Sequence, residues 1–461
     1  MSGQVRHGWL ISDRHEPIPA AISRDRDSVT LTLTSRYAEP AERWPEQLDP
    51  RTSWDSLVDL VFIDEEGTIE LAECFPNSRR GTGPGKMVEK WEFQPRFVIL
   101  DGNGRTWGSV TTIETFAPML REWLGESARR IDWNLTWEND GEWLGIDLKS
   151  PYSIDVNGDL SHQIIAESRT ESSPRQDGIH AFSAARISTR LRNASERDVA
   201  MAEHASILDF LTIVFGRRTT YSTRKIQSLE NPVLGIDGTA FDPNFTHECE
   251  VLSPQDHLDG SDYIPEIRSS PLIFSSSDAA LTLSRWLKFQ SENRVGVAAL
   301  IRAISERRSW ENKLLNTAVA FEEFGYKLSG SVECGTSDSN FPTYVKRICL
   351  DMPRITMARP EIWARRFNAA YKGIKHADNE IPGLREIVVT TEQGIGFLRA
   401  WCCFKADPEN PIIDPFWGRL IDFEEFYPAS GGGNAEEDWR GLIPDSVWDE
   451  EFTRLGKARM D

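Results

Sequence analysis

The sequence has little of what marks a secreted or membrane-spanning protein. Its 461 residues include six cysteines, none in a Cys-x-x-Cys pair, which argues against a disulfide framework. No run of about 18 apolar residues is present, so we expect no membrane-spanning helix. The first residues lack the apolar core of a secretory signal, and a cytoplasmic location is therefore expected.

Motifs of common enzyme classes are also missing. No GxSxG, HExxH or metal-spaced cluster of ligands occurs, which disfavours a hydrolase or metal enzyme built on those motifs. Residues 80–87 imitate a phosphate-binding loop, but Arg80 replaces its first glycine and Met87 replaces the magnesium-binding Ser or Thr. His247 and Cys249 lack a second ligand pair. We expect no metal and no other cofactor.

Charge is distributed unevenly along the chain. The net charge is −20, so the protein as a whole should not coat nucleic acid non-specifically. Between Lys346 and Lys375, however, eight basic residues face only two acidic ones. Residues 407–461 then carry fourteen acidic and five basic residues. An anionic ligand should therefore prefer the basic stretch, unless the acidic tail folds over it.

Periodicity predicts an α+β protein. Val29 to Thr34 alternates apolar and polar residues, as a half-buried strand does, and residues 57–63 and 68–71 flank a turn sequence. Residues 97–100 precede a second turn, and Asn157-Gly158 predicts a type I′ hairpin. We expect a β-rich N-terminal domain over 1–230, a loop-rich connection over 231–275, a helical domain over 276–407 and an acidic extension over 408–461.

Helical periodicity is strong in several segments. In residues 197–215 the apolar stripe contains Val199, Ala202, Ala205 and Leu208, and Gly216 ends the helix. Further helices are expected over residues 281–289, 295–304, 310–328, 342–351 and 361–376. Residues 387–389 and 395–401 fit either a strand or a helix.

The helix expected over residues 361–376 has two contrasting faces. Its apolar stripe is formed by Trp363, Phe367, Tyr371 and Ile374. A polar stripe places Asn368, Lys372 and His376 one turn apart, with Arg365 at its edge; Arg366 and Lys375 add positive charge, and Asp378 is close enough in sequence to orient the imidazole.

Imidazole and ammonium groups one turn apart suit phosphodiester chemistry. Imidazole titrates near neutral pH and can move a proton, while the ammonium can offset charge on a phosphate. A surface helix that ends in a favourably placed cation explains the same pattern without any catalysis. The helix by itself leaves both interpretations open.

Three segments resemble the ApeA-like (abortive phage exclusion) proteins, whose C-terminal domain belongs to the HEPN superfamily. The segment from Tyr371 to Asp378 resembles the late Arg…His motif of that helical bundle. Residues 311–324, which end in Glu322 and Glu323, resemble its preceding helix. Residues 205–216 resemble the end of the β-rich N-terminal domain.

The resemblance implies a metal-independent ribonuclease of phage defence. It implies a homodimer that cleaves RNA, with tRNA among the candidate substrates, after a phage-derived trigger. His376 would be the acid/base, Lys372 the phosphate contact and Asn368 a catalytic-site partner, with Arg365, Arg366, Lys375, Asp378 and Glu323 as supporting or RNA-binding groups.

The chain departs from the family motif at the arginine. The family places four to six residues between arginine and histidine, where this chain has Tyr371, Ala370 and Ala369. Lys372 is the nearest cation, and lysine offers a point charge instead of a bidentate fork. A non-catalytic sensing or dimerisation module is therefore the alternative function.

Overall fold

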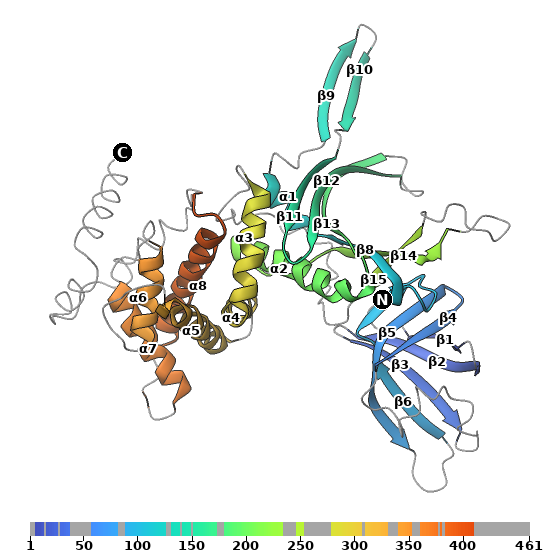
Figure 1. Ribbon diagram of the computed structural model, residues 1–461, viewed down its shortest axis with the longest axis horizontal. Helices are drawn as coiled ribbons and strands as arrows, with labels where there is room; N and C mark the ends of the chain where they lie inside the picture. The colour runs from blue at the N-terminus through green and yellow to red at the C-terminus, as the bar shows by residue number, and fades with distance from the viewer. Residues whose placement is uncertain are drawn as a thin grey trace. The chain divides into compact units, whose positions relative to one another are not determined.

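A computed structural model shows the fold of most of the chain (Figure 1). It describes residues 5–12, 15–25, 28–36, 57–81, 88–125, 131–138, 141–148, 151–172, 179–233, 246–252, 278–306, 309–330, 340–352, 360–376, 379 and 383–409. Asp378, residues 82–87 of the sequence that resembles a phosphate-binding loop and nearly all of the expected acidic extension lie outside these residues.

The chain forms two compact units. Unit 1 comprises residues 1–122, 126–205 and 220–264, and unit 2 comprises residues 123–125, 206–219 and 265–461. Strands dominate the described part of unit 1, and helices dominate that of unit 2. The predicted α+β class, β-rich first and helical second, is confirmed.

The strands are labelled in chain order. They are β1 (Val5–Ser12), β2 (His15–Asp25), β3 (Ser28–Arg36), β4 (Val58–Asp64), β5 (Gly67–Gly81), β6 (Val88–Gln94), β7 (Phe97–Leu100), β8 (Val110–Phe116), β9 (Ile131–Glu138), β10 (Gly141–Leu148), β11 (Tyr152–Asn157), β12 (Ser161–Ser172), β13 (Ile179–Arg190), β14 (Thr223–Pro232) and β15 (Thr246–Leu252).

Six of the described strands close into a barrel. The order β5-β4-β1-β2-β3-β6 returns to its start because β6 also pairs with β5, and all of these pairs are antiparallel (Figure 1). Alternate residues point inward and fill the interior with apolar side chains such as Leu31, Phe62 and Leu71, each 0 % exposed. The described side chains of the barrel interior therefore form a packed core.

Strand β5 changes partner at Glu73. Its residues 69–72 pair with β7, and from Phe75 onward it pairs with β6. Between these stretches, residues 72–73 stand opposite Asp59 of β4, which makes a β-bulge. Glu73 has φ 55°, a left-handed conformation that is rare for residues other than glycine, and its N–H donates to the Asp59 carboxylate at 2.8 Å.

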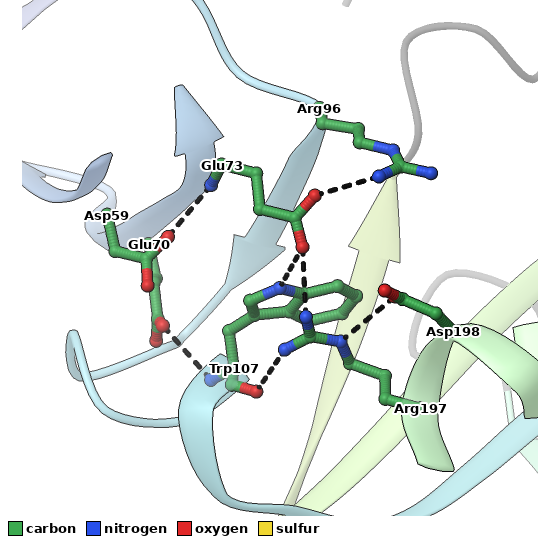
Figure 2. A network of polar contacts seen from close by, with 7 residues as sticks. All are labelled: Asp59, Glu70, Glu73, Arg96, Trp107, Arg197 and Asp198. Atoms are coloured by element: carbon green, nitrogen blue, oxygen red, sulfur yellow. Dashed lines mark hydrogen bonds and ion pairs between the residues drawn. The ribbon is translucent and has the colours of Figure 1, made fainter. Parts of the chain in front are cut away.

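The Glu73 side chain joins three segments (Figure 2). Its carboxylate accepts hydrogen bonds from Trp107 Nε1 at 3.1 Å, Arg197 Nη2 at 2.9 Å and Arg96 Nη1 at 3.1 Å. The Arg197 guanidinium lies 4.1 Å from the centroid of the Trp107 ring and donates to the Trp107 carbonyl oxygen at 2.8 Å. This clasp connects the bulged strand with the start of helix α2 (Arg197–Phe215).

Glu70 stabilises the turn that leads to Trp107. Its carboxylate is 0 % exposed and accepts the backbone N–H groups of Gly104, Thr106 and Trp107 at 3.0–3.1 Å. A side chain at Gly102 would have no room, because its Cβ would lie 2.7 Å from that of Glu70. The predicted turn after residue 100 is confirmed, and a buried carboxylate organises it.

The remaining strands continue the sheet beyond β7 in the order β15-β14-β8-β13-β12-β11, while β9 and β10 pair only with each other among the described strands. A loop-rich connection was expected over residues 231–275, but this segment contains strand β15. The strand forms there because it pairs with β14 and β7. The hairpin at Asn157-Gly158 is confirmed, but its turn is not the two-residue type I′, since Asn157 pairs with Ser161 and leaves three residues between them.

The helices of unit 2 match the predicted segments closely. They are α3 (Ala279–Glu292), α4 (Arg294–Ser305), α5 (Trp310–Lys327), α6 (Phe341–Asp351), α7 (Pro360–Lys375) and α8 (Leu384–Ala406), and the short α1 (Pro118–Leu124) lies at the junction of the units in sequence. Residues 387–389 and 395–401, which fitted strand or helix, belong to α8. This helix packs against α3, α4, α5 and α7.

Aromatic side chains form the centre of unit 2. Phe321 of α5 contacts the rings of Phe341, Trp363, Phe367 and Phe397, at centroid distances of 5.3–6.1 Å. These rings come from α6, α7 and α8, so one residue of α5 joins four helices. Burial of such large rings supplies most of the packing energy of a bundle.

Arg399 closes the C-terminal end of α2. It donates from Nε to the carbonyl oxygen of Ile213 at 2.7 Å and from Nη2 to that of Val214 at 3.0 Å. A cation is favourable at this negative end of a helix. Gly216 follows with φ 66°, as predicted for the residue that ends the helix, and a Cβ there would lie 2.5 Å from the guanidinium carbon.

We expect Glu73→Ala to lower the free energy of unfolding by roughly 2–4 kcal/mol, because it leaves the Trp107 indole and the Arg197 guanidinium without their shared acceptor. Urea denaturation followed by tryptophan fluorescence measures the loss. Glu65→Ala, in the exposed β4–β5 turn, is the matched control and should change stability by less than about 0.5 kcal/mol. Equal losses in both variants would contradict this role for Glu73.

Candidate functional site

Helix α7 buries the predicted apolar stripe. Trp363 is 1 % exposed, Phe367 0 % and Tyr371 7 %, and they pack on α5 and α6. The helix begins at Pro360, where the fixed φ of proline favours a first helical residue. The packing of this stripe decides which side of α7 faces solvent.

The opposite side carries the predicted site residues. Lys372 and His376 are exposed and Asn368 is partly buried. The His376 N–H donates to the Lys372 carbonyl oxygen at 3.0 Å, so helical geometry continues to His376 and the two side chains lie one turn apart. Within the described part of the chain, neither the imidazole nor the Lys372 ammonium has a hydrogen-bond partner.

The two arginines flank this stripe. Arg365 is exposed and Arg366 is partly buried, on the turn of α7 that precedes Asn368. The structure therefore places five of the predicted residues on or beside one polar face: Arg365, Arg366, Asn368, Lys372 and His376. Such a face can contact a phosphate and move a proton.

Lys375 is connected to α5 through Tyr371. The Lys375 ammonium donates to the Tyr371 hydroxyl at 3.0 Å, and this hydrogen bond raises the pKa of Lys375. Tyr371 in turn hydrogen-bonds to the Glu322 carboxylate. Burial raises the pKa of Glu322, while Lys375 and Tyr371 oppose that rise. The sequence predicted only an apolar role for Tyr371, although its four-residue spacing from Lys375 was a signal for this contact.

A surface pocket of about 400 Å³ lies between α5 and the start of α6. Its lining consists of Val319 together with Glu322, Glu323, Tyr326, Asn340, Phe341 and Tyr344. Glu323, predicted as a supporting residue of the α7 site, thus lies in this pocket, where it forms an ion pair with Lys327 at 3.2 Å. Glu322 belongs both to the pocket and to the contact with α7.

Unit 1 contains a buried polar chain that sequence reasoning missed. The two ring nitrogens of His204 form hydrogen bonds with Thr115 Oγ1 and Thr189 Oγ1, both at 2.8 Å. Thr189 Oγ1 also forms a hydrogen bond with the His162 ring. His162 Nε2 lies 2.8 Å from the Glu203 carboxylate. Complete burial lowers the pKa of His204. Each ring nitrogen has a partner, so we interpret the chain as structural.

The predicted limits of α2 are correct, but the prediction of its buried face is wrong in the first half of the helix. Val199 is 37 % exposed, and Ala202 and Ala205 are exposed as well, whereas His204 is fully buried. The helix turns its polar His204 inward because strands β8 and β13 offer threonine hydroxyls there. Periodicity counts apolar residues and cannot register a buried histidine.

Asp209 has the most strongly shifted pKa among the described carboxyl groups of unit 2. It accepts a hydrogen bond from Gln290 Nε2 at 2.9 Å. Burial raises its pKa to about 7, against the weaker opposing effects of Gln290 and Arg218. The group lies where α2 meets α3, and we expect its ionisation to affect stability.

Two further findings concern metals and membranes. In the described ranges, no group of three or more His, Cys, Asp or Glu side chains is arranged to bind a metal ion. Over the same ranges, every helix is too short or too polar to span a membrane.

The fold defines a two-part α+β protein in which a barrel-containing β unit precedes a helical unit. The sequence model of one family, described as ApeA N-terminal domain 1, matches residues 6–287, more than half of the chain. The chain therefore belongs to this family, and it is an anti-phage defence protein of the abortive-infection type. No curated protein and no solved structure matches it. The predicted resemblance to ApeA-like proteins is confirmed.

We expect Tyr371→Phe to raise the pKa of Glu322 and lower that of Lys375, because both lose a hydrogen bond that favours their charged form. NMR titration with carbon-13 labels in the side chains measures both values. Tyr344→Phe, in the same pocket but without this pair of contacts, is the control. Unchanged values in Tyr371→Phe would show that the hydroxyl does not couple the two helices.

We expect Asp209→Asn to stabilise the protein at pH 8, by up to about 4 kcal/mol. The folded-state pKa of Asp209 is raised, so its ionisation lowers stability progressively from about pH 4 to about pH 7, and the whole penalty is present above pH 7. The variant should lack this pH dependence in thermal denaturation. Glu292→Gln, exposed on α3, should keep the wild-type profile; an unchanged profile in Asp209→Asn would contradict the assignment.

Proposed function

We propose that the chain is an RNA-cleaving effector of anti-phage defence, in which unit 2 acts as a HEPN-like ribonuclease domain. The observation that carries the proposal is the exposed pair of Lys372 and His376 on a helix whose other face is buried. His376 moves the proton of the attacking or leaving oxygen, and Lys372 binds the phosphate. Asn368 and Arg365 support the phosphate contact. We further propose RNA, with tRNA as one candidate, as substrate, a phage-derived trigger and a homodimer.

The exposure of the positions where the family motif has its arginine supports this assignment of the active face. Among the three motif positions, Ala370 and Tyr371 are buried, whereas Ala369 is exposed. Ala369 precedes His376 by seven residues, which is two helical turns and therefore the same side of α7. An arginine at this position would reach the phosphate site, and Lys372 provides the charge in its place.

The second candidate function is a non-catalytic sensing or dimerisation module. The lack of an arginine at the motif position favours it, because lysine cannot bind phosphate through a bidentate fork. In that case the exposed face of α7 binds without cleaving. The two functions differ in their dependence on His376.

The test is phage challenge of cells that express wild type, His376→Ala, Lys372→Ala or Ala369→Arg, with total RNA examined for discrete cleavage. We expect His376→Ala to abolish protection and cleavage, and Lys372→Ala to reduce cleavage by about 10²–10³-fold. Ala369→Arg should increase cleavage, because it supplies the bidentate cation on the same face.

Asn312→Ala, at an exposed position near the start of α5, serves as a control for expression and folding. Protection that persists in His376→Ala without RNA cleavage would reject the nuclease and establish the binding module. Cleavage that persists in His376→Ala would show that the chemistry resides elsewhere.

A further inference from the structure

We infer that the pocket between α5 and α6 binds an unpaired guanine base of the RNA substrate. The inference rests on the proposed action on RNA and adds base recognition to it. A volume of about 400 Å³ accommodates one nucleoside. The pocket has aromatic walls, two carboxylates and one amide, which together suit a flat base with hydrogen-bond donors on its edge.

The aromatic walls provide stacking surfaces. Tyr326 is 61 % exposed, which is unusual for so large a side chain, and Tyr344 and Phe341 line the same space. Gly325 permits this arrangement, because a Cβ there would lie 2.3 Å from that of Tyr344. Helix α6 thereby approaches α5 closely enough to place two tyrosines at one pocket. Unpaired RNA bases are commonly held by such stacking.

The polar groups match the Watson–Crick edge of guanine. Guanine offers two adjacent donors, N1–H and N2–H, which a carboxylate accepts together, and one acceptor, O6. We assign the donors to Glu323, because a carboxylate that pairs with one lysine, here Lys327 at 3.2 Å, keeps lone pairs for further donors. Asn340 Oδ1 accepts from Thr343 N at 3.0 Å and Thr343 Oγ1 at 2.9 Å, so its amide nitrogen remains to donate to O6.

Lysine side chains of α7 and α5 lie beside the pocket carboxylates. Lys375 reaches Tyr371 and, through it, Glu322, while Lys327 is paired with Glu323 at 3.2 Å. Each pocket carboxylate therefore has a lysine nearby, which offsets repulsion of a nucleotide phosphate. Lys372 and His376 follow on the adjacent stripe of the same helix. A base in the pocket would hold its nucleotide beside the proposed cleavage face.

The experiment measures binding without cleavage, in the full-length His376→Ala variant. Fluorescence anisotropy is recorded with a labelled six-nucleotide uridine RNA that carries guanosine, inosine, adenosine or uridine at one position. We expect guanosine to bind at least about tenfold more tightly than inosine, which lacks the N2 amino group. Added Glu323→Gln should remove this preference. Asn340→Asp should remove it too, while keeping the side-chain cap of α6.

Glu65→Gln, in the exposed β4–β5 turn of unit 1, is the matched control and should retain the preference. Equal affinity for the four RNAs overturns the inference, and so does a guanosine preference that persists in Glu323→Gln and Asn340→Asp. Displacement of the RNA by a capped arginine amide, but not by guanosine, would show a site for cationic side chains instead. His376-dependent cleavage without base preference would reject the pocket assignment alone and leave the proposed nuclease intact.

Discussion

The double pairing of strand β5 is the constraint on which unit 1 depends. One strand must pair with β7 and then with β6, and this requires the bulge and the left-handed backbone at Glu73. The unfavourable conformation is offset by hydrogen bonds to the backbone and the carboxylate of that residue. The bulge lets β5 close the barrel through β6 and also extend the sheet through β7.

Unit 2 is organised by a different principle. Its helices are amphipathic, and the burial of aromatic rings around Phe321 determines how each helix is rotated. For α7 this rotation exposes Lys372 and His376 and buries Tyr371. The proposed chemistry is thus a consequence of core packing on the other side of the helix.

The same packing joins the two proposed sites. Tyr371 is buried by its ring, yet its hydroxyl contacts Lys375 and Glu322, so the pocket of α5 and α6 adjoins the polar face of α7. In the anti-phage setting shown by the family, such proximity would let one domain select a nucleotide and act on its phosphate. Base recognition by α5 and α6 would then lie next to the proposed cleavage face of α7.

The sequence by itself determined the α+β class, most helix limits, the turn sequences and the two faces of α7, because these follow from side-chain spacing over a few residues. It did not determine the buried face of α2, the strand β15 or the pocket. Those depend on partners distant along the chain: Glu73 and Arg197 are 124 residues apart, and Thr115 and His204 are 89 apart. Only the tertiary structure could decide them, since a polar residue is buried or exposed according to the hydrogen-bond partner that the fold brings to it.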